Sequence, residues 1–395
     1  MKKLGPTKLL IGELIFAIPL SLVLFIFQHN FQVLLYTAFL IIALLFIYRS
    51  SNLISHIFNI LALPYIFLNL YTILLNLLLK RFTKFELGLY ILYFIGILVI
   101  LVPVMVRDYG SIKKPIWELL TSVWLIFNLF LAPSLDVVAN QFIMGVNNSN
   151  LLLAILFLEY AILVIKGWGY RFYFNLKMNQ ASIFYYSLLV VLVLVAIWVI
   201  CFSVFITGAA NWEQALWNWN LWIIDLTNSI EIKNIWELIF IAFRAAIMEE
   251  SARYIFLLTL LISFTKRKRQ ALEAILLSSA IFSLLHILNF SAPGATLNSV
   301  LTQILHTFGF GCILAVIFLY SGKLWLIILL HIFADILSSS LNPLGYSGIL
   351  LNTKSNIIVG LGIINVIPLI CVAIILINKK SRSYVYQNIK IILAK

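Results

Sequence analysis

Long apolar segments alternate with short polar segments along most of the chain. A membrane-spanning helix needs about 20 mostly apolar residues, and about twelve segments of the sequence come close to that length. This pattern predicts an all-α polytopic membrane protein with about twelve transmembrane helices. The expected spans are residues 11–27, 31–48, 57–79, 87–106, 116–132, 151–165, 182–206, 235–265, 271–288, 297–320, 324–341 and 357–377.

The composition supports the same class of protein. Hydrophobic residues make up 63% of the chain and charged residues only 10%, whereas soluble domains contain about 25% charged residues. The formal net charge of +13 would indicate a nucleic-acid partner in a soluble protein. Here the basic residues concentrate in short loops between the expected spans, so the charge indicates membrane orientation. We expect the lipid bilayer, and no nucleic acid, as a partner.

The distribution of Lys and Arg predicts which loops face the cytoplasm, because cytoplasmic loops are enriched in these residues. The lysines within residues 2–8 and the basic runs at 266–269 and 379–382 place both termini in the cytoplasm. The tryptophan-rich segment 211–222 falls outside, where we expect a short helix on the membrane surface. Counting the spans from a cytoplasmic N-terminus places the basic loop at residues 80–84 on the external side. Either one span is miscounted, or a basic loop is tolerated on the external side at this position.

Two adjacent glutamates, Glu249 and Glu250, interrupt the apolar segment 235–264. Placing an ionised group in a membrane helix costs about 2.5–3.5 kcal/mol on insertion scales, so such a pair is expected to have partners or a function. Arg253 lies four residues after Glu249 and three after Glu250. At about 100° per residue its side chain falls between the two carboxylates and can pair with either. Taken alone, these residues also fit a structural cluster that holds helices together.

Two later apolar segments each add a histidine at helical spacing from a second residue. Phe282 precedes His286 by four residues, and Asp335 follows His331 by four. A glutamate can activate a water while a histidine helps to accept its proton, and a second histidine with an aspartate can stabilise an oxyanion. A set of Glu250, His286 and His331 could instead hold a divalent metal such as zinc. Both arrangements predict amide hydrolysis, and the sequence leaves the cofactor unknown.

One further span carries polar residues that fit helix packing better than chemistry. Thr302, Gln303 and His306 form a polar stripe, for which we expect interhelical hydrogen bonds. Gly309 and Gly311 on the same segment are expected to let a neighbouring helix approach closely.

The three motifs occur in the order found in the CPBP family, and this part of the chain resembles that family. The family comprises the CAAX prenyl endopeptidases and bacteriocin-processing proteins, and it is also called the Abi family. The resemblance covers about residues 235–341. It rests on three motifs, Glu249-Glu250 with Arg253, Phe282-x-x-x-His286 and His331-x-x-x-Asp335. It also rests on the sequence around Gln303, Gly309-Phe-Gly311 and Tyr320-Ser-Gly-Lys-Leu-Trp325.

The resemblance implies an intramembrane endopeptidase that cleaves prenylated proteins, peptide pheromones or leader peptides, by either a glutamate-based or a metal-dependent mechanism. It implies that one of the two glutamates activates water with His286, while His331 and Asp335 assist. Arg253 and Phe282 would support the site. The chain departs from the family at one point, because Arg253 comes three residues after the second glutamate rather than four. The shorter Glu-Glu-x-x-basic pattern of related membrane proteases therefore also fits.

These observations divide the chain into three regions. Residues 1–180 form an N-terminal transmembrane region of unknown role, residues 181–378 a CPBP/Abi-like protease domain, and residues 379–395 a basic cytoplasmic tail.

We expect an integral protein of a bacterial plasma membrane whose substrate is a membrane-bound or amphipathic peptide or protein. A non-catalytic immunity or partner-stabilising protein on the same scaffold is the main alternative. A proton- or metal-coupled transporter is less favoured, because the sequence has no internal repeat.

Overall fold

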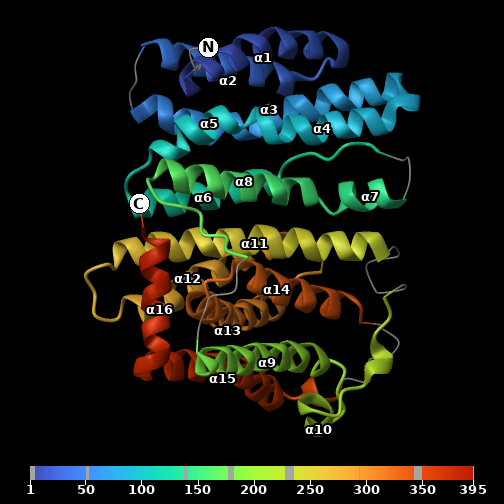
Figure 1. The fold of residues 1–395 in the computed structure, drawn as a ribbon. Helices are drawn as coiled ribbons and strands as arrows, with labels where there is room; N and C mark the ends of the chain where they lie inside the picture. The colour runs from blue at the N-terminus through green and yellow to red at the C-terminus, as the bar shows by residue number, and fades with distance from the viewer. Residues whose placement is uncertain are drawn as a thin grey trace. The chain divides into compact units, whose positions relative to one another are not determined.

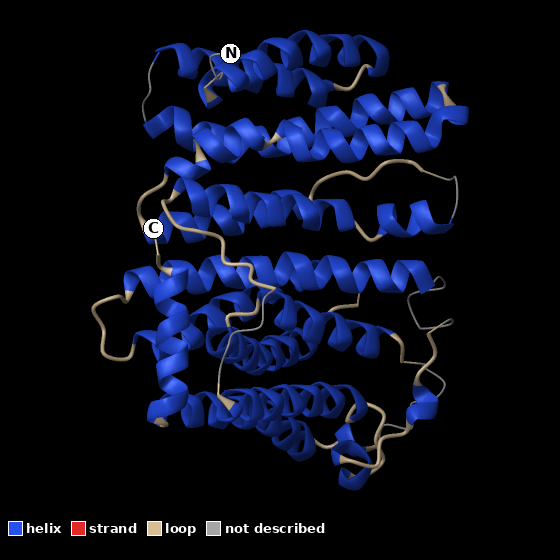
Figure 2. Ribbon diagram, in the orientation of Figure 1, coloured by secondary structure: helices blue, strands red, loops and turns tan. Residues whose placement is uncertain are grey.

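The chain is folded almost entirely into helices (Figure 2). The computed structural model describes residues 5–49, 53–137, 141–176, 182–226, 235–292, 294–341 and 349–394. In these ranges the backbone forms no β-strand, only an isolated bridge between Ile224 and Leu341. The predicted all-α fold is confirmed. Contacts divide the chain into two compact units, unit 1 at residues 1–171 and unit 2 at residues 172–395.

Unit 1 is built from apolar helices that pack on their neighbours along the chain (Figure 1). The first two helices pack on each other, and the third packs on both the second and the fourth. Its helices are α1 (Pro6–Gln28), α2 (Phe31–Arg49), α3 (Leu53–Arg81), α4 (Glu86–Ile100), α5 (Val102–Arg107), α6 (Pro115–Phe130), α7 (Gln141–Asn148) and α8 (Leu151–Gly167), with short 3-10 helices at Thr83–Phe85 and Tyr109–Ser111.

Unit 2 carries all of the predicted site residues. Its helices are α9 (Ile183–Phe205), α10 (Trp212–Leu216), α11 (Ile235–Ser263), α12 (Gln270–Leu285), α13 (Leu297–Ser321), α14 (Leu324–Ser339), α15 (Lys354–Ile377) and α16 (Lys379–Ile392), with 3-10 helices at Leu221–Ile223, His286–Ser291 and Leu350–Asn352. In Figure 1, α11 forms one side of the unit, α12, α13 and α14 its middle, and α9 and α15 its other side. Helix α16 crosses the ends of these helices.

Helix α13 forms the centre of unit 2, where it contacts α9, α12, α15 and α16. A capping box between Thr296 and Ser299 defines its start. At its end Gly322 adopts φ +66°, a left-handed conformation that favours glycine. Gly309 allows α15 to approach, because a Cβ there would lie 2.5 Å from the Ile364 carbonyl oxygen. The expected close packing at this glycine is confirmed.

Each of the twelve expected spans falls on one helix or on two consecutive helices. Eight helices of the described part are long and apolar enough to cross a membrane, or nine if the bent pair α7 and α8 is one span. Helix α11 is not among them, because its motif residues give it more charges than a membrane span usually has. Helices α6 and α14 are not among them either, because each has only 16 residues. The count of twelve spans therefore stays a prediction.

Several expectations concern segments at the edges of these helices. The domain boundary expected at residue 180 and the lysines at positions 2 and 3 lie outside the described residues. Residues 379–392 of the expected tail form α16, which packs on α13. Within the tryptophan-rich segment the helical parts are α10 and the 3-10 helix at Leu221–Ile223.

Replacing Gly309 by alanine should destabilise unit 2 by about 1–3 kcal/mol, because the added methyl group would overlap the α15 backbone. Gly362→Ala is the matched control, since nothing lies within 4 Å of a Cβ at that position. The control should be neutral or slightly stabilising, because alanine favours helix over glycine. Thermal unfolding of both purified variants in detergent measures the difference, and equal melting temperatures would contradict the packing role of Gly309.

Candidate active site

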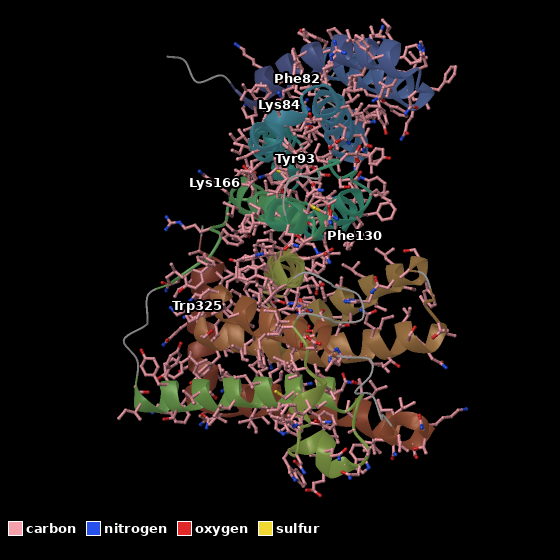
Figure 3. The ribbon with its side chains drawn as sticks, turned by 90° about the vertical axis from the view of Figure 1, so that its right-hand side faces the viewer. Phe82, Lys84, Tyr93, Phe130, Lys166 and Trp325 are labelled. Carbon is pink, nitrogen blue, oxygen red and sulfur yellow. The ribbon has the colours of Figure 1, made fainter. Side chains whose placement is uncertain are left out.

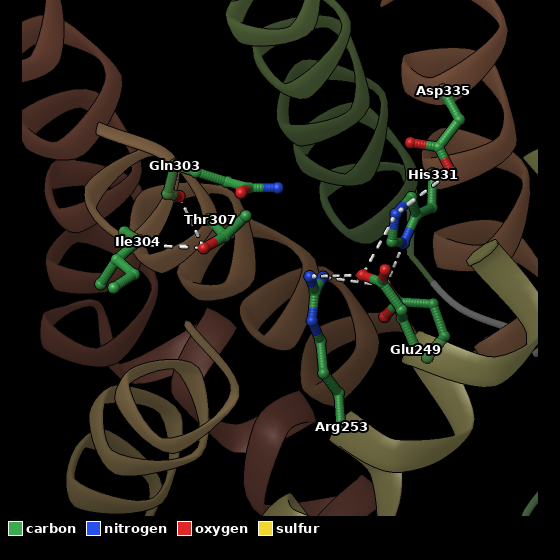
Figure 4. A network of polar contacts seen from close by, with 8 residues as sticks. Glu249, Arg253, Gln303, Ile304, Thr307, His331 and Asp335 are labelled. Atoms are coloured by element: carbon green, nitrogen blue, oxygen red, sulfur yellow. Dashed lines mark hydrogen bonds and ion pairs between the residues drawn. The ribbon is translucent and has the colours of Figure 1, made fainter. Parts of the chain in front are cut away.

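The Glu250 carboxylate is the centre of a buried polar network in unit 2. Its partners Arg253 and His331 are labelled in Figure 4. The Oε1 atom of Glu250 accepts a hydrogen bond from Nη1 of Arg253 at 2.8 Å and lies 2.6 Å from Nδ1 of His331. The Glu250 side chain is fully buried, and His331 and Arg253 are almost fully buried. An ionised carboxylate only accepts hydrogen bonds, so with Glu250 ionised, Nδ1 of His331 is the donor. This bond joins α11 to α14.

Glu249 lies beside this centre but makes looser contacts. Its Oε2 atom is 3.6 Å from Nη2 of Arg253 and 3.6 Å from Nε2 of His331. The expectation that Arg253 can pair with either glutamate is confirmed. Nε2 of His331 also lies 3.5 Å from Oδ2 of Asp335. The side chain of Glu249 is 30% exposed and that of Asp335 27% exposed, whereas Glu250 is fully enclosed.

Local sequence explains why α11 can bring its charges against α14. Ala242 and Ala246 are fully buried and pack on Ile332, so the two helices meet through small residues one and two turns before the glutamates. Small side chains let helix backbones approach closely in membranes. The glutamates therefore lie at the level of His331, where the helices are still close enough for direct hydrogen bonds.

Two phenylalanines enclose the charged side chains. The Arg253 guanidinium lies over the ring of Phe282 at 4.0 Å from its centroid and 5.6 Å from that of Phe310. Phe310 also meets the His331 ring edge to face at 5.4 Å. Cation–π contacts stabilise an arginine that has lost its water, by about 2 kcal/mol when desolvated. The network is thus held by α11, α12, α13 and α14 together.

His286 lies near this network without bonding to it. It follows the last residue of α12, and its ring meets Phe282 edge to face at 5.4 Å. It interacts electrostatically with Glu249, yet within the described residues it forms no ion pair with either glutamate. Its Nδ1 atom is buried and has no hydrogen-bond partner among them. Phe282 therefore connects His286 to the Arg253 side of the network.

The polar stripe of α13 borders the same region. Gln303 accepts a hydrogen bond from Asn289 at 2.8 Å, which confirms an interhelical bond at this position. Thr307 donates to the Gln303 carbonyl on its own helix (Figure 4). His306 forms no hydrogen bond with another described residue, so the bond expected for it is not seen there. It stacks on Phe310 with centroids 6.3 Å apart and interacts electrostatically with His286. Sequence analysis assigned His306 to packing and missed its place beside the site.

No group of three His, Cys, Asp or Glu side chains in the described ranges is arranged to hold a metal ion. Within the set of Glu250, His286 and His331, the Oε1 atom of Glu250 is already shared by Arg253 and His331.

Comparison with known proteins supports the resemblance inferred from the motifs. Residues 231–337 match the family model of the Type II CAAX prenyl endopeptidase Rce1-like proteins. The chain carries an Rce1-like domain. This domain contains both glutamates, Arg253, Phe282, both motif histidines and Asp335. It supports a CAAX-type intramembrane protease in general. No curated protein and no solved structure matched the chain.

Unit 1 contains a second buried polar cluster that sequence analysis did not identify. Asp108 is fully buried, and its Oδ1 lies 2.6 Å from Nη1 of Arg107 and 2.6 Å from Nδ1 of His56. Asn59 donates to the other carboxylate oxygen at 3.4 Å. The three-residue spacing of His56 and Asn59 on one face of α3 is the only local signal, because Asp108 lies about fifty positions away. The cluster anchors the start of α3 to the end of α5.

Glu250→Ala should destabilise unit 2 by about 3–5 kcal/mol, because it leaves the Arg253 guanidinium buried without its main partner. Glu249→Ala should cost much less, since its side chain is partly exposed and its contacts are longer. The double variant Glu250→Ala with Arg253→Met should recover part of the loss, because no uncompensated charge remains. Unfolding of the three variants in detergent tests this order, and equal losses for Glu249→Ala and Glu250→Ala would contradict it.

Proposed function

We propose that the chain is an intramembrane endopeptidase that hydrolyses a peptide bond in a membrane-associated protein or peptide. The observation that carries this proposal is the network of Glu249, Glu250, His331 and Asp335 within the Rce1-like domain. A purely structural ion pair would need only Glu250 and Arg253. The partly exposed Glu249 and Asp335 add two carboxyl groups that make no short contact with Arg253.

We assign the role of general base to Glu249. A base must reach both a water and the substrate, and the Glu249 side chain is 30% exposed while Glu250 is fully buried. Both hydrogen bonds to Glu250 use its Oε1 atom and hold it between Arg253 and His331. Glu250 is therefore a positioning residue that fixes the orientation of the His331 ring.

The reaction begins when Glu249 takes a proton from a water and the resulting hydroxide attacks the peptide carbonyl carbon. The carbonyl π bond breaks and leaves a tetrahedral intermediate with a negative oxygen. Protonated Glu249 then gives its proton to the amide nitrogen, the carbon–nitrogen bond breaks, and an acid and an amine are released. We propose that His286, which interacts electrostatically with Glu249, helps Glu249 to accept the proton of the attacking water.

His331 and a protonated Asp335 are proposed to donate hydrogen bonds to the oxyanion, since an ionised carboxylate only accepts. Because Nδ1 of His331 donates to Glu250, its Nε2 faces Glu249 and Asp335, on the more exposed side of the network. With Nδ1–H donated to Glu250, Nε2 can donate only when the ring is protonated as imidazolium, and this Nε2–H would be directed towards a carbonyl oxygen bound there. Preorganised donors of this kind typically contribute a factor of about 10²–10³ in rate.

The substrate is proposed to reach the site from the bilayer, as a prenylated or otherwise membrane-bound protein, a leader peptide or a pheromone precursor. The apolar helices around the site favour substrates that partition into membrane. We propose that the chain acts in a bacterial plasma membrane with both termini in the cytoplasm, the orientation that the basic loops predict.

Glu249→Ala should lower cleavage by about 10²–10⁴-fold, the usual contribution of a general base. Membrane peptides from cells that express the wild-type chain or the variant at matched levels would be compared by mass spectrometry. Peptides that depend on the wild-type chain identify the substrate, and the same peptides made synthetically give the rate. His286→Ala and His331→Ala should also be severe.

Glu273 provides the control, because its side chain is similarly exposed to that of Glu249 and it pairs with Arg267 outside the network. Glu273→Ala should cleave at the wild-type rate. Full activity of a chain with both Glu249→Ala and Glu250→Ala, inserted at normal levels, would reject the enzyme and favour an immunity-type protein.

Asp335→Asn should retain activity within about tenfold of wild type, because an amide can still donate to an oxyanion. Asp335→Leu should lose about 10²-fold or more, since it has no donor. Rates of the two variants on the same synthetic peptide separate a donor role from a charge role. Equal, large losses in both variants would indicate that the negative charge of Asp335 is required instead.

A further inference from the structure

An apolar groove lies between α9 and the first turn of α14, away from the catalytic network. Its volume is about 220 Å³, and its α9 wall runs from Tyr185 to Leu194. At 1.5 Å per residue this wall is about 14 Å long, which suits an extended hydrocarbon chain. The lining residues are Tyr185, Tyr186, Leu189, Val190, Val193, Leu194, Lys323, Trp325 and Leu326, and this set contains no acidic side chain.

Polar groups gather at the end of the groove where both helices begin. The Nε1 atom of Trp325 is buried and has no hydrogen-bond partner in the described part of the chain. A buried indole N–H normally finds an acceptor. Figure 3 shows Trp325 over the part of α9 near its start. Lys323 lines the same end of the groove, and Nζ of Lys380 lies 4.6 Å from the ring centroid of Phe184, next to Tyr185.

The backbone adds further positive potential at this end. Helix α9 begins at Ile183 and helix α14 at Leu324, so both present their N-termini there. A helix N-terminus carries about half a positive charge and unpaired N–H groups. Two helix ends, two lysines and an indole N–H thus favour an anionic group with acceptor oxygens.

We propose that this groove binds an anionic glycerophospholipid, with an acyl chain along α9 and the phosphate at Lys323, Lys380 and Trp325. The hydrocarbon wall fits the acyl chain, and the positive charge at its end favours a headgroup with a net negative charge over a zwitterionic one. The orientation expected from the basic loops puts this end in the cytoplasmic leaflet, where anionic lipids concentrate. The site does not depend on the proposed catalytic function.

The test is lipid binding to the purified full-length chain, followed by native mass spectrometry. Phosphatidylglycerol and phosphatidylcholine with identical acyl chains are titrated separately, and a lipid-modified peptide is titrated in a third series. The wild-type chain should bind phosphatidylglycerol about 25-fold more tightly than phosphatidylcholine, as expected for two lysines that each contribute about fivefold near an anionic headgroup. Lys323→Gln and Lys380→Gln should each reduce this preference about fivefold.

Matched variants distinguish contacts with the lipid headgroup from contacts with the acyl chain. Trp325→Phe should weaken both lipids, because it keeps an aromatic ring but removes the N–H donor to the phosphate that both lipids carry. Val190→Trp should weaken both lipids by filling the groove, whereas Val366→Trp on α15 should not, although the two valines are similarly exposed at 56% and 52%. Lys390→Gln, on an exposed position of α16, controls for net charge. Melting temperatures of all variants confirm that each is folded.

Three results would overturn the proposal. Equal binding of the two lipids by the wild-type chain would remove the headgroup selectivity. Equal effects of Val190→Trp and Val366→Trp would show that the groove is not the site. Binding of the lipid-modified peptide alone, without phosphatidylglycerol, would assign the groove to substrate rather than to a membrane lipid.

Discussion

The fold of unit 2 depends on the hydrogen bonds that one buried carboxylate receives. Glu250 lies in an apolar helix, where an ionised group without partners would be strongly unfavourable. Its Oε1 atom receives Arg253 from the same helix and His331 from α14. Because these bonds work only at one relative position of α11 and α14, they fix the register of the two helices. The Phe282 and Phe310 rings then limit the movement of Arg253.

This arrangement gives two neighbouring glutamates different properties. Adjacent residues on a helix point about 100° apart, so the two carboxylates meet different surroundings. Glu250 faces the interior and is committed to two donors, while Glu249 faces the more exposed side. One acid therefore stabilises the structure and the other is available for chemistry. The proposed hydrolysis requires this separation, because a base held by two strong donors would be poorly suited to take a proton.

The one-residue shift of the arginine relative to the family pattern determines which glutamate the arginine pairs with. At three residues from Glu250, Arg253 makes its short ion pair with that residue and only a longer contact with Glu249. The shift therefore places the arginine on the carboxylate that is buried. His286 stands apart from this pair, connected through Phe282 at the end of α12.

The sequence by itself determined the all-α fold, the helix positions and the motif residues, because apolar length and helical spacing are local properties. The pairing of Arg253 with both glutamates also follows from spacing along one helix. Only the tertiary structure decided which glutamate is buried, because that depends on how α14 approaches α11. For the same reason it alone brought His306 beside the site through Phe310. It also joined His56 to Asp108, since contacts between residues far apart in the chain leave no local pattern.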